Sequence, residues 1–219
     1  MSQVSEATAR LCDKGIVAVV RAKSSEQLID VAHSLLAGGV ECIEITMTTP
    51  NALDVINACR KTVTGAMIGV GSVLDVATAA AAIEAGAQFV VSPVFVPGVV
   101  AKAHECEVPV VPGCFTPTEI INATNAGADL VKVFPAGFFG PKFFKAILAP
   151  MPHLKLTPTG GVDLTTAGAW IAAGAKTLGV GSALVTKKAL AEGNFDEIES
   201  LARRYVEIVA EARSELGKS

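Results

Sequence analysis

The chain has 219 residues, of which 51% are hydrophobic and 18% are charged, and its formal net charge is -3. The high apolar share and low charge exclude an intrinsically disordered protein, and the slightly negative net charge gives no basic surface for nucleic acid. No apolar run approaches the roughly 18 residues of a membrane span. Five cysteines without a close C-x-x-C pair favour a reduced, cytoplasmic protein over a secreted one.

Short β-rich segments alternate with alanine-rich helical segments along the whole chain. Residues 1–15 are expected to form an amphipathic helix, not a signal peptide. Strands are predicted at 16–21, 40–46, 66–70, 88–92, 108–111, 129–134, 155–158 and 177–180. Helices are predicted at 25–37, 51–61, 74–85, 97–105, 117–125, 142–148, 164–173, 182–191 and 195–215.

The order of these segments predicts an α/β fold, a (β/α)8 TIM barrel with an extra N-terminal helix. Several predicted helices end on Ala-Gly before the next strand, a weak internal repeat typical of βα units in series. No linker interrupts them, so residues 1–219 are expected to form one domain. An open doubly wound sheet is the alternative. The segment after the first strand reads Arg-Ala-Lys-Ser-Ser, however, and lacks the G-x-G-x-x-G of that fold.

Two charged residues are expected inside this barrel. If Ile43 and Ile45 face the helices, then Glu44 and Thr46 face inward, and the same alternation in the sixth strand turns Lys132 and Phe134 inward. Burying an isolated charge costs several kcal/mol, so each needs a reason to be there. One reason is a purely structural Lys–Glu pair, and the other is chemistry at the carboxyl ends of the strands.

Glycines follow the seventh and eighth strands, where TIM barrels commonly bind phosphate. Thr159-Gly160-Gly161 ends one strand and Gly181-Ser182 ends the other. Exposed backbone N–H groups in such loops attract an anion, although glycines can also serve tight turns alone.

Arg21 ends the first strand, where it is either a surface residue or a clamp for a substrate carboxylate. A histidine-based metal site is not expected, because His33, His104 and His153 all lie away from the carboxyl ends of the strands. No metal or other cofactor is therefore assigned.

A buried lysine without a metal suggests imine chemistry. Only a neutral amine attacks a carbonyl, and apolar surroundings disfavour the charged form. An imine on Lys132 would act as an electron sink for breaking an adjacent C–C bond, and Glu44 would move the protons. With a phosphate site, this predicts an aldolase acting on a phosphorylated keto acid.

The strand-end motifs together resemble those of the 2-keto-3-deoxy-6-phosphogluconate (KDPG) aldolases, a family that includes the 4-hydroxy-2-oxoglutarate (KHG) aldolases. They cover almost the whole chain in order: Glu44-Ile-Thr46, Gly69-Val-Gly71-Ser72-Val73, Ser92-Pro93, Val111-Pro-Gly113, Lys132-Val-Phe134-Pro-Ala136, Pro158-Thr-Gly160-Gly-Val162 and Gly179-Val-Gly181-Ser182.

The resemblance implies a homotrimeric class I lyase that cleaves KDPG to pyruvate and glyceraldehyde 3-phosphate in the Entner–Doudoroff route of carbohydrate metabolism, and also cleaves KHG. It implies Lys132 as the Schiff-base lysine and Glu44 as the acid/base. The substrate-binding residues that it implies are Thr46, Ser72, Pro93, Phe134, Gly160, Gly161, Gly181 and Ser182.

One position departs from the family pattern. Many members have an arginine after the second strand for the pyruvate carboxylate, whereas this chain has Thr48. Other branches carry an arginine at the end of the first strand, and by that analogy Arg21 is expected to bind the carboxylate. Thr159 stands where relatives acting on the galactonate epimer tend to have valine, so KDPG is expected to be the preferred substrate.

Three other functions fit the same residues. One is a 2-keto-3-deoxy-6-phosphogalactonate aldolase, which acts on the galactonate epimer. In a phosphosugar isomerase or epimerase, Glu44 would be the base and Lys132 would stabilise an enolate. In a non-catalytic phosphosugar-binding protein, Lys132 and Glu44 would be a structural pair.

Overall fold

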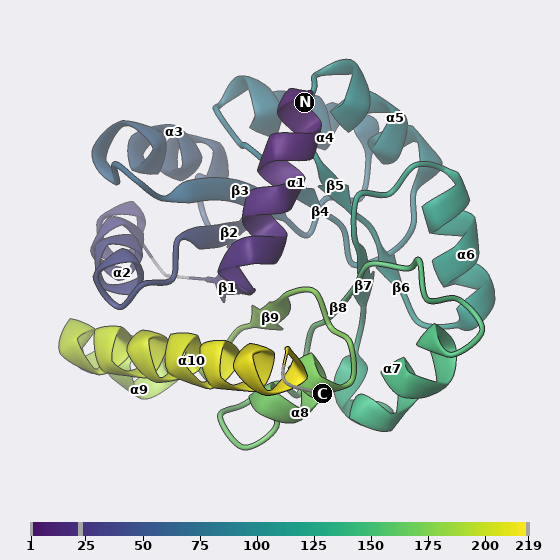
Figure 1. Cartoon of the computed structure of the whole chain (residues 1–219). Helices are drawn as coiled ribbons and strands as arrows, with labels where there is room; N and C mark the ends of the chain where they lie inside the picture. The colour runs from purple at the N-terminus through teal and green to yellow at the C-terminus, as the bar shows by residue number, and fades with distance from the viewer. Residues whose placement is uncertain (1, 22–23, 218–219) are drawn as a thin grey trace.

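The computed structural model describes residues 2–21 and 24–217, and in these ranges strands alternate with helices that surround them (Figure 1). The strands are β1 (Ile16–Val20), β2 (Cys42–Thr46), β3 (Met67–Gly71), β4 (Val90–Val91), β5 (Val110–Val111), β6 (Gly113–Cys114), β7 (Val131–Val133), β8 (Leu156–Pro158) and β9 (Leu178–Val180). The helices are α1 (Gln3–Lys14), α2 (Ser25–Ala37), α3 (Ala52–Thr62), α4 (Val76–Glu84), α5 (Pro97–Glu105), α6 (Pro117–Asn125), the 3-10 turn Ala136–Phe138, α7 (Pro141–Leu148), α8 (Ala167–Ala172), α9 (Lys187–Glu192) and α10 (Phe195–Leu216).

All strand pairs are parallel, and they form a curled sheet in two parts. One part has the order β5-β4-β3-β2-β1-β9 and the other β6-β7-β8. The parts meet at two places. Pro112, which has no N–H to donate, separates β5 from β6, and a bridge between Thr159 and Gly179 joins the end of β8 to β9. The carboxyl ends of the strands therefore lie at one end of the sheet.

The predicted alternation of inward and outward side chains is confirmed. Ile43, Ile45, Val131 and Val133 belong to the large apolar core between the strands and the helices. A second, smaller core fills the space that the strands enclose; its buried members are Leu11, Val17, Cys42, Met67, Phe89, Val91, Val111 and Leu130. Cys42 and Leu130 thus face inward, as do the charged residues two positions after each.

Helix α1 lies across the amino-terminal ends of the strands (Figure 1). Leu11 projects from it into the inner core and is 1% exposed. Lys14 and Arg10 form ion pairs with Glu41, at 2.5 and 2.9 Å, and the Arg213 guanidinium donates to the carbonyl oxygens of the α1 residues Cys12 and Asp13. Leu11 therefore closes one end of the space inside the strands.

Most predicted elements differ from the structure by one or two residues at an end, and three differ for an identifiable local reason. The strand expected at 108–111 is two short strands, because Pro112 interrupts it, and it extends to Cys114. The helix expected at 164–173 begins at Ala167, because the Asp163 carboxylate accepts hydrogen bonds from Thr165 and Thr166 before it. The helix expected at 182–191 begins at Lys187, because the preceding residues turn back on Gly181 and Thr186 caps the helix.

Candidate active site

Two buried charged side chains meet inside the curled sheet, near the carboxyl ends of β2 and β7. The Lys132 Nζ lies 3.9 Å from the Glu44 Oε1, and the two residues are 6% and 2% exposed. This distance is too long for a direct hydrogen bond but short enough for strong attraction in a poorly hydrated space. The two inward residues predicted from alternation are thus brought together.

The Glu44 carboxyl lies against the end of β3, beside Gly71. A Cβ at position 71 would lie 1.8 Å from the Glu44 Oε1, so only glycine leaves room for the carboxyl there. Burial raises the pKa of Glu44 above its ordinary value of 4.5, and the positive charges of Lys132 and Arg21 oppose that rise. A carboxyl in this state can exchange protons nearer to neutral pH than an exposed glutamate.

Below the pair is a small space, here called the inner cavity. Its volume is about 20 Å³, room for about one water molecule. Glu44, Lys132 and Thr159 line it from one side and Leu11 of α1 lines it too. The catalytic candidates therefore have apolar packing and little water beneath them.

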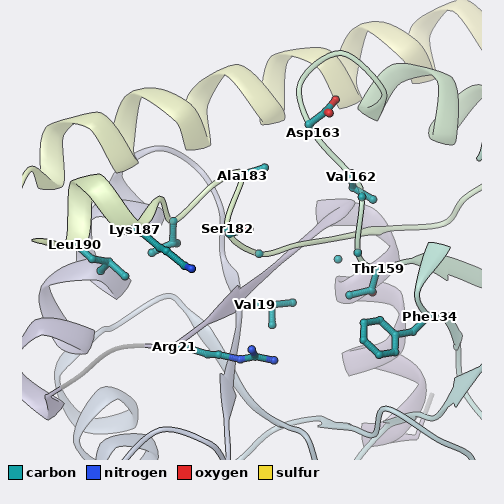
Figure 2. A pocket seen from close by; sticks show the side chains of 15 residues that line it. Val19, Arg21, Phe134, Thr159, Val162, Asp163, Ser182, Ala183, Lys187 and Leu190 are labelled. Carbon is teal, nitrogen blue, oxygen red and sulfur yellow. The ribbon is translucent and has the colours of Figure 1, made fainter. Parts of the chain in front are cut away.

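A larger cavity of about 480 Å³, here called the outer pocket, opens at the carboxyl ends of the strands (Figure 2). Seven predicted site residues line it, and Thr159 borders both cavities. The seven are Arg21, Phe134, Thr159, Gly160, Gly161, Gly181 and Ser182.

The loop after β8 forms one wall of the outer pocket. Gly160 and Gly161 have φ values of 81° and 82°, a region that favours glycine, and a Cβ at Gly161 would lie 2.6 Å from the Cα of Gly137. The Gly137 N–H donates to the Gly160 carbonyl at 2.8 Å, which fixes the loop against the 3-10 turn. These glycines allow a close, rigid loop.

The turn after β9 forms the opposite wall. The Leu184 and Val185 N–H groups both donate to the Gly181 carbonyl, at 2.9 and 3.0 Å, so Ser182 lies at the tip of a tight turn and is exposed. Arg21 follows β1 between the two walls, and its guanidinium points toward Phe134 in Figure 2. The Phe134 ring in turn lies 5.3 Å from the Lys132 Nζ.

The other three predicted binding residues line neither cavity. Thr46 is fully buried, and its hydroxyl lies 2.8 Å from that of Thr48. Ser72 is half-buried at the end of β3 with a φ of 62°, unusual for a residue with a side chain. Pro93 is half-buried after β4, and its carbonyl lies close to Gly113.

Two residues of the site escaped sequence reasoning. Gly71 belongs to one of the strand-end motifs, but its contact with the Glu44 side chain on the neighbouring strand β2 is visible only in the structure. Lys187 lines the outer pocket, where a helix expected from 182 gave no reason to place it. The signal for Lys187 is Thr186, a helix-capping residue directly before it.

Within residues 2–21 and 24–217, no three His, Cys, Asp or Glu side chains gather as ligands for a metal ion. Over the same ranges, no helix has the length and apolar character needed to cross a membrane.

Comparison with known proteins gives consistent results. A family model described as KDPG and KHG aldolase matches residues 7–201. The chain is 36% identical to a KHG/KDPG aldolase of Escherichia coli K12 over 193 residues, covering 88% of this chain and 91% of that protein. It is 35% identical to a 2-dehydro-3-deoxy-phosphogluconate aldolase of Treponema pallidum over 195 residues, covering 89% and 93%.

Among solved structures, a KDPG aldolase from Legionella pneumophila, with pyruvate captured at low pH as a covalent carbinolamine intermediate, superposes with a TM-score of 0.84. That comparison has 27% sequence identity and covers 90% of this chain and 96% of the other.

Proposed function

Since the chain belongs to the family of KDPG and KHG aldolases, we propose that it is a metal-independent class I aldolase that cleaves KDPG to pyruvate and glyceraldehyde 3-phosphate. Cleavage of KHG to pyruvate and glyoxylate is the slower side activity. The observation that carries this proposal is the buried Lys132 amine, 3.9 Å from the Glu44 carboxyl, in an inner cavity that shares Thr159 with the outer pocket.

In the proposed reaction, the neutral Lys132 amine attacks the C2 ketone of KDPG and forms a carbinolamine. Loss of hydroxide as water, with a proton supplied by Glu44, gives a protonated imine. The burial of Lys132 beside Glu44 supports this step, because a group that can donate and accept protons lies 3.9 Å from the amine.

The imine then draws the electrons of the C3–C4 bond. As that bond breaks, the Glu44 carboxylate accepts the C4 hydroxyl proton and glyceraldehyde 3-phosphate leaves, with an enamine of pyruvate on Lys132. Protonation of the enamine at C3 restores the imine, and water hydrolyses it to free pyruvate and the amine. The position of Glu44 beside Lys132 supports its use in both proton transfers.

The remaining site residues bind the two ends of the substrate. Arg21, whose charge reaches Glu44, binds the keto-acid carboxylate in place of the family arginine that Thr48 replaces. Phe134 packs beside the imine. Thr46, Ser72 and Pro93 shape the pyruvate end, and the backbone of Gly160, Gly161, Gly181 and Ser182 binds the phosphate.

Thr159 selects the KDPG epimer over the galactonate epimer. Its side chain is buried between the two cavities, where a hydroxyl can bond to the substrate's C4 or C5 hydroxyl. With the wrong epimer the Thr159 hydroxyl would lose this hydrogen bond, which would cost roughly 1–3 kcal/mol of binding free energy. A ratio of kcat/KM values near one for the two epimers would refute this role.

The purified protein tests the activity directly. Pyruvate release from KDPG and from KHG is followed with excess EDTA present, and we expect cleavage of both, faster with KDPG. Absence of pyruvate from either substrate, or activity lost to EDTA and restored by a divalent metal, would overturn the proposal.

We also propose that residues 1–219 form a single closed (β/α)8 barrel with α1 as an extra helix. We further propose that the protein acts in the cytoplasm and that three copies assemble into a homotrimer. Exposed apolar side chains at the carboxyl ends of the strands support a contact with further copies. Phe138 is 83% exposed. Nearby, the Phe139 ring stacks on Phe143 with centroids 4.3 Å apart and meets Phe115 in a tilted contact at 4.5 Å. Sedimentation of a monomer at micromolar concentration would contradict the trimer.

A further inference from the structure

Two positively charged side chains line the outer pocket. Arg21 and Lys187 both line it, and neither forms an ion pair with a carboxylate in the described ranges. In Figure 2 the Lys187 side chain extends from α9 into the space between Ser182 and Arg21. The described lining of the outer pocket therefore carries two cationic side chains and one acidic residue, Asp163.

Asp163, the acidic residue lining the pocket, does not neutralise these cations. Its carboxylate accepts hydrogen bonds from the Thr165 N–H and hydroxyl, at 2.9 and 2.6 Å, and from Thr166. These bonds hold the pKa of Asp163 below its ordinary value, and Figure 2 shows the carboxylate pointing away from Lys187 and Arg21. The Asp163 carboxylate is therefore bonded to the residues that directly precede α8.

Nothing within α9 accounts for a lysine at position 187. The helix starts at this residue, and a cation in the first turn faces the positive end of the helix, which is unfavourable. The neighbouring Lys188 is exposed and does not line the pocket. Lys187 alone of the two therefore has a position suited to an anion in the pocket.

We propose that Lys187 binds the phosphate of the substrate and makes the enzyme selective for phosphorylated over unphosphorylated keto acids. This inference rests on the proposed aldolase function. The two cations bind different groups of the substrate. Arg21 binds the carboxylate, which every keto-acid substrate has, and Lys187 binds the phosphate, which only phosphorylated substrates have. A phosphate with nearly two negative charges, set against the glycine loop and Ser182, gains a third, charged contact from Lys187.

The test compares kcat/KM for KDPG and for KHG in the wild type and in K187A, K187R and the matched control K188A. A charge-assisted contact contributes about tenfold or more in binding. We expect K187A to lower the KDPG to KHG ratio of kcat/KM by about tenfold, with the change shrinking in high salt, and K187R to restore most of the ratio. K188A should keep the wild-type ratio.

A second measurement does not depend on catalysis. Inorganic phosphate should raise the melting temperature of the wild type and of K188A, and this stabilisation should be largely lost in K187A. An unchanged substrate ratio together with an unchanged phosphate effect in K187A would overturn the role of Lys187 while leaving the aldolase intact. A wild type that cleaves neither substrate but is stabilised by phosphate only when Lys187 is present would overturn the proposed function and keep the phosphate site.

Discussion

Replacing Gly71 with alanine should disable the site through Glu44, although Gly71 itself carries no reactive group. The added Cβ would lie 1.8 Å from the Glu44 Oε1 and 2.4 Å from its Cδ. The main chain of β3 is held by β2 on one side and β4 on the other, so the glutamate side chain must move instead.

The size of that movement follows from the geometry. To reach an ordinary contact of 3.4 Å the carboxyl must retreat by about 1.6 Å, and the inner cavity of about 20 Å³ offers it little space. A displacement of about 1 Å in a catalytic group can cost about 10²-fold, and general acid–base catalysis as a whole contributes about 10²–10⁴-fold. We therefore expect kcat/KM of G71A to fall by about 10²–10⁴-fold, with a loss in stability of about 1–3 kcal/mol.

The assay is steady-state cleavage of KDPG by G71A, E44Q and the double variant, with stability followed by urea unfolding. The matched control is G168A in α8, whose new Cβ would lie 3.6 Å from Ile208, an ordinary contact, so its kcat should equal that of the wild type. Because G71A acts through Glu44, the double variant should be no slower than E44Q. A folded G71A with wild-type kcat/KM, or losses that multiply in the double variant, would refute the reasoning.

Three further predictions concern the same site. R21A should raise KM for pyruvate in the condensation direction by well over tenfold, and an unchanged KM would remove Arg21 from the site. The proposed cleavage needs the Glu44 carboxylate, and burial raises the pKa of that group. We therefore expect kcat/KM to fall as the pH drops through a midpoint above 4.5 and expect E44Q to lack this fall; a midpoint at or below 4.5 would contradict the geometry. L11A should remove apolar packing from the inner cavity and lower the free energy of urea unfolding by about 2–5 kcal/mol. Because water then reaches Glu44 more easily, the acidic fall in kcat/KM should move to lower pH. An unchanged pH midpoint would show that α1 does not influence Glu44.

The two central residues could be predicted from sequence because strand alternation is a local rule. Once Ile43 and Val131 are assigned to the helix-facing side, Glu44 and Lys132 must face inward, and the sheet brings them together. The glycines after the helices were also readable, since Gly86 and Gly127 adopt positive φ where the chain leaves a helix.

What escaped prediction depends on contacts between distant segments. Gly71 looks like any rim glycine until the Glu44 side chain is seen beside it. In the sequence, Leu11 is one apolar residue of an amphipathic helix. Only the packing of α1 in the structure shows that Leu11 lines the same small cavity as Glu44 and Lys132. Lys187 was hidden because a tight turn on Gly181 delays α9 by five residues from its predicted start.

The most direct measurement is borohydride reduction in the presence of pyruvate, followed by intact mass and peptide mapping. A covalent imine predicts one stable adduct per chain on the peptide that contains Lys132, absent without pyruvate and absent from K132R. An unmodified chain, or an adduct on another lysine, would show that the buried amine does not condense with the ketone, as in an isomerase or a simple binding protein.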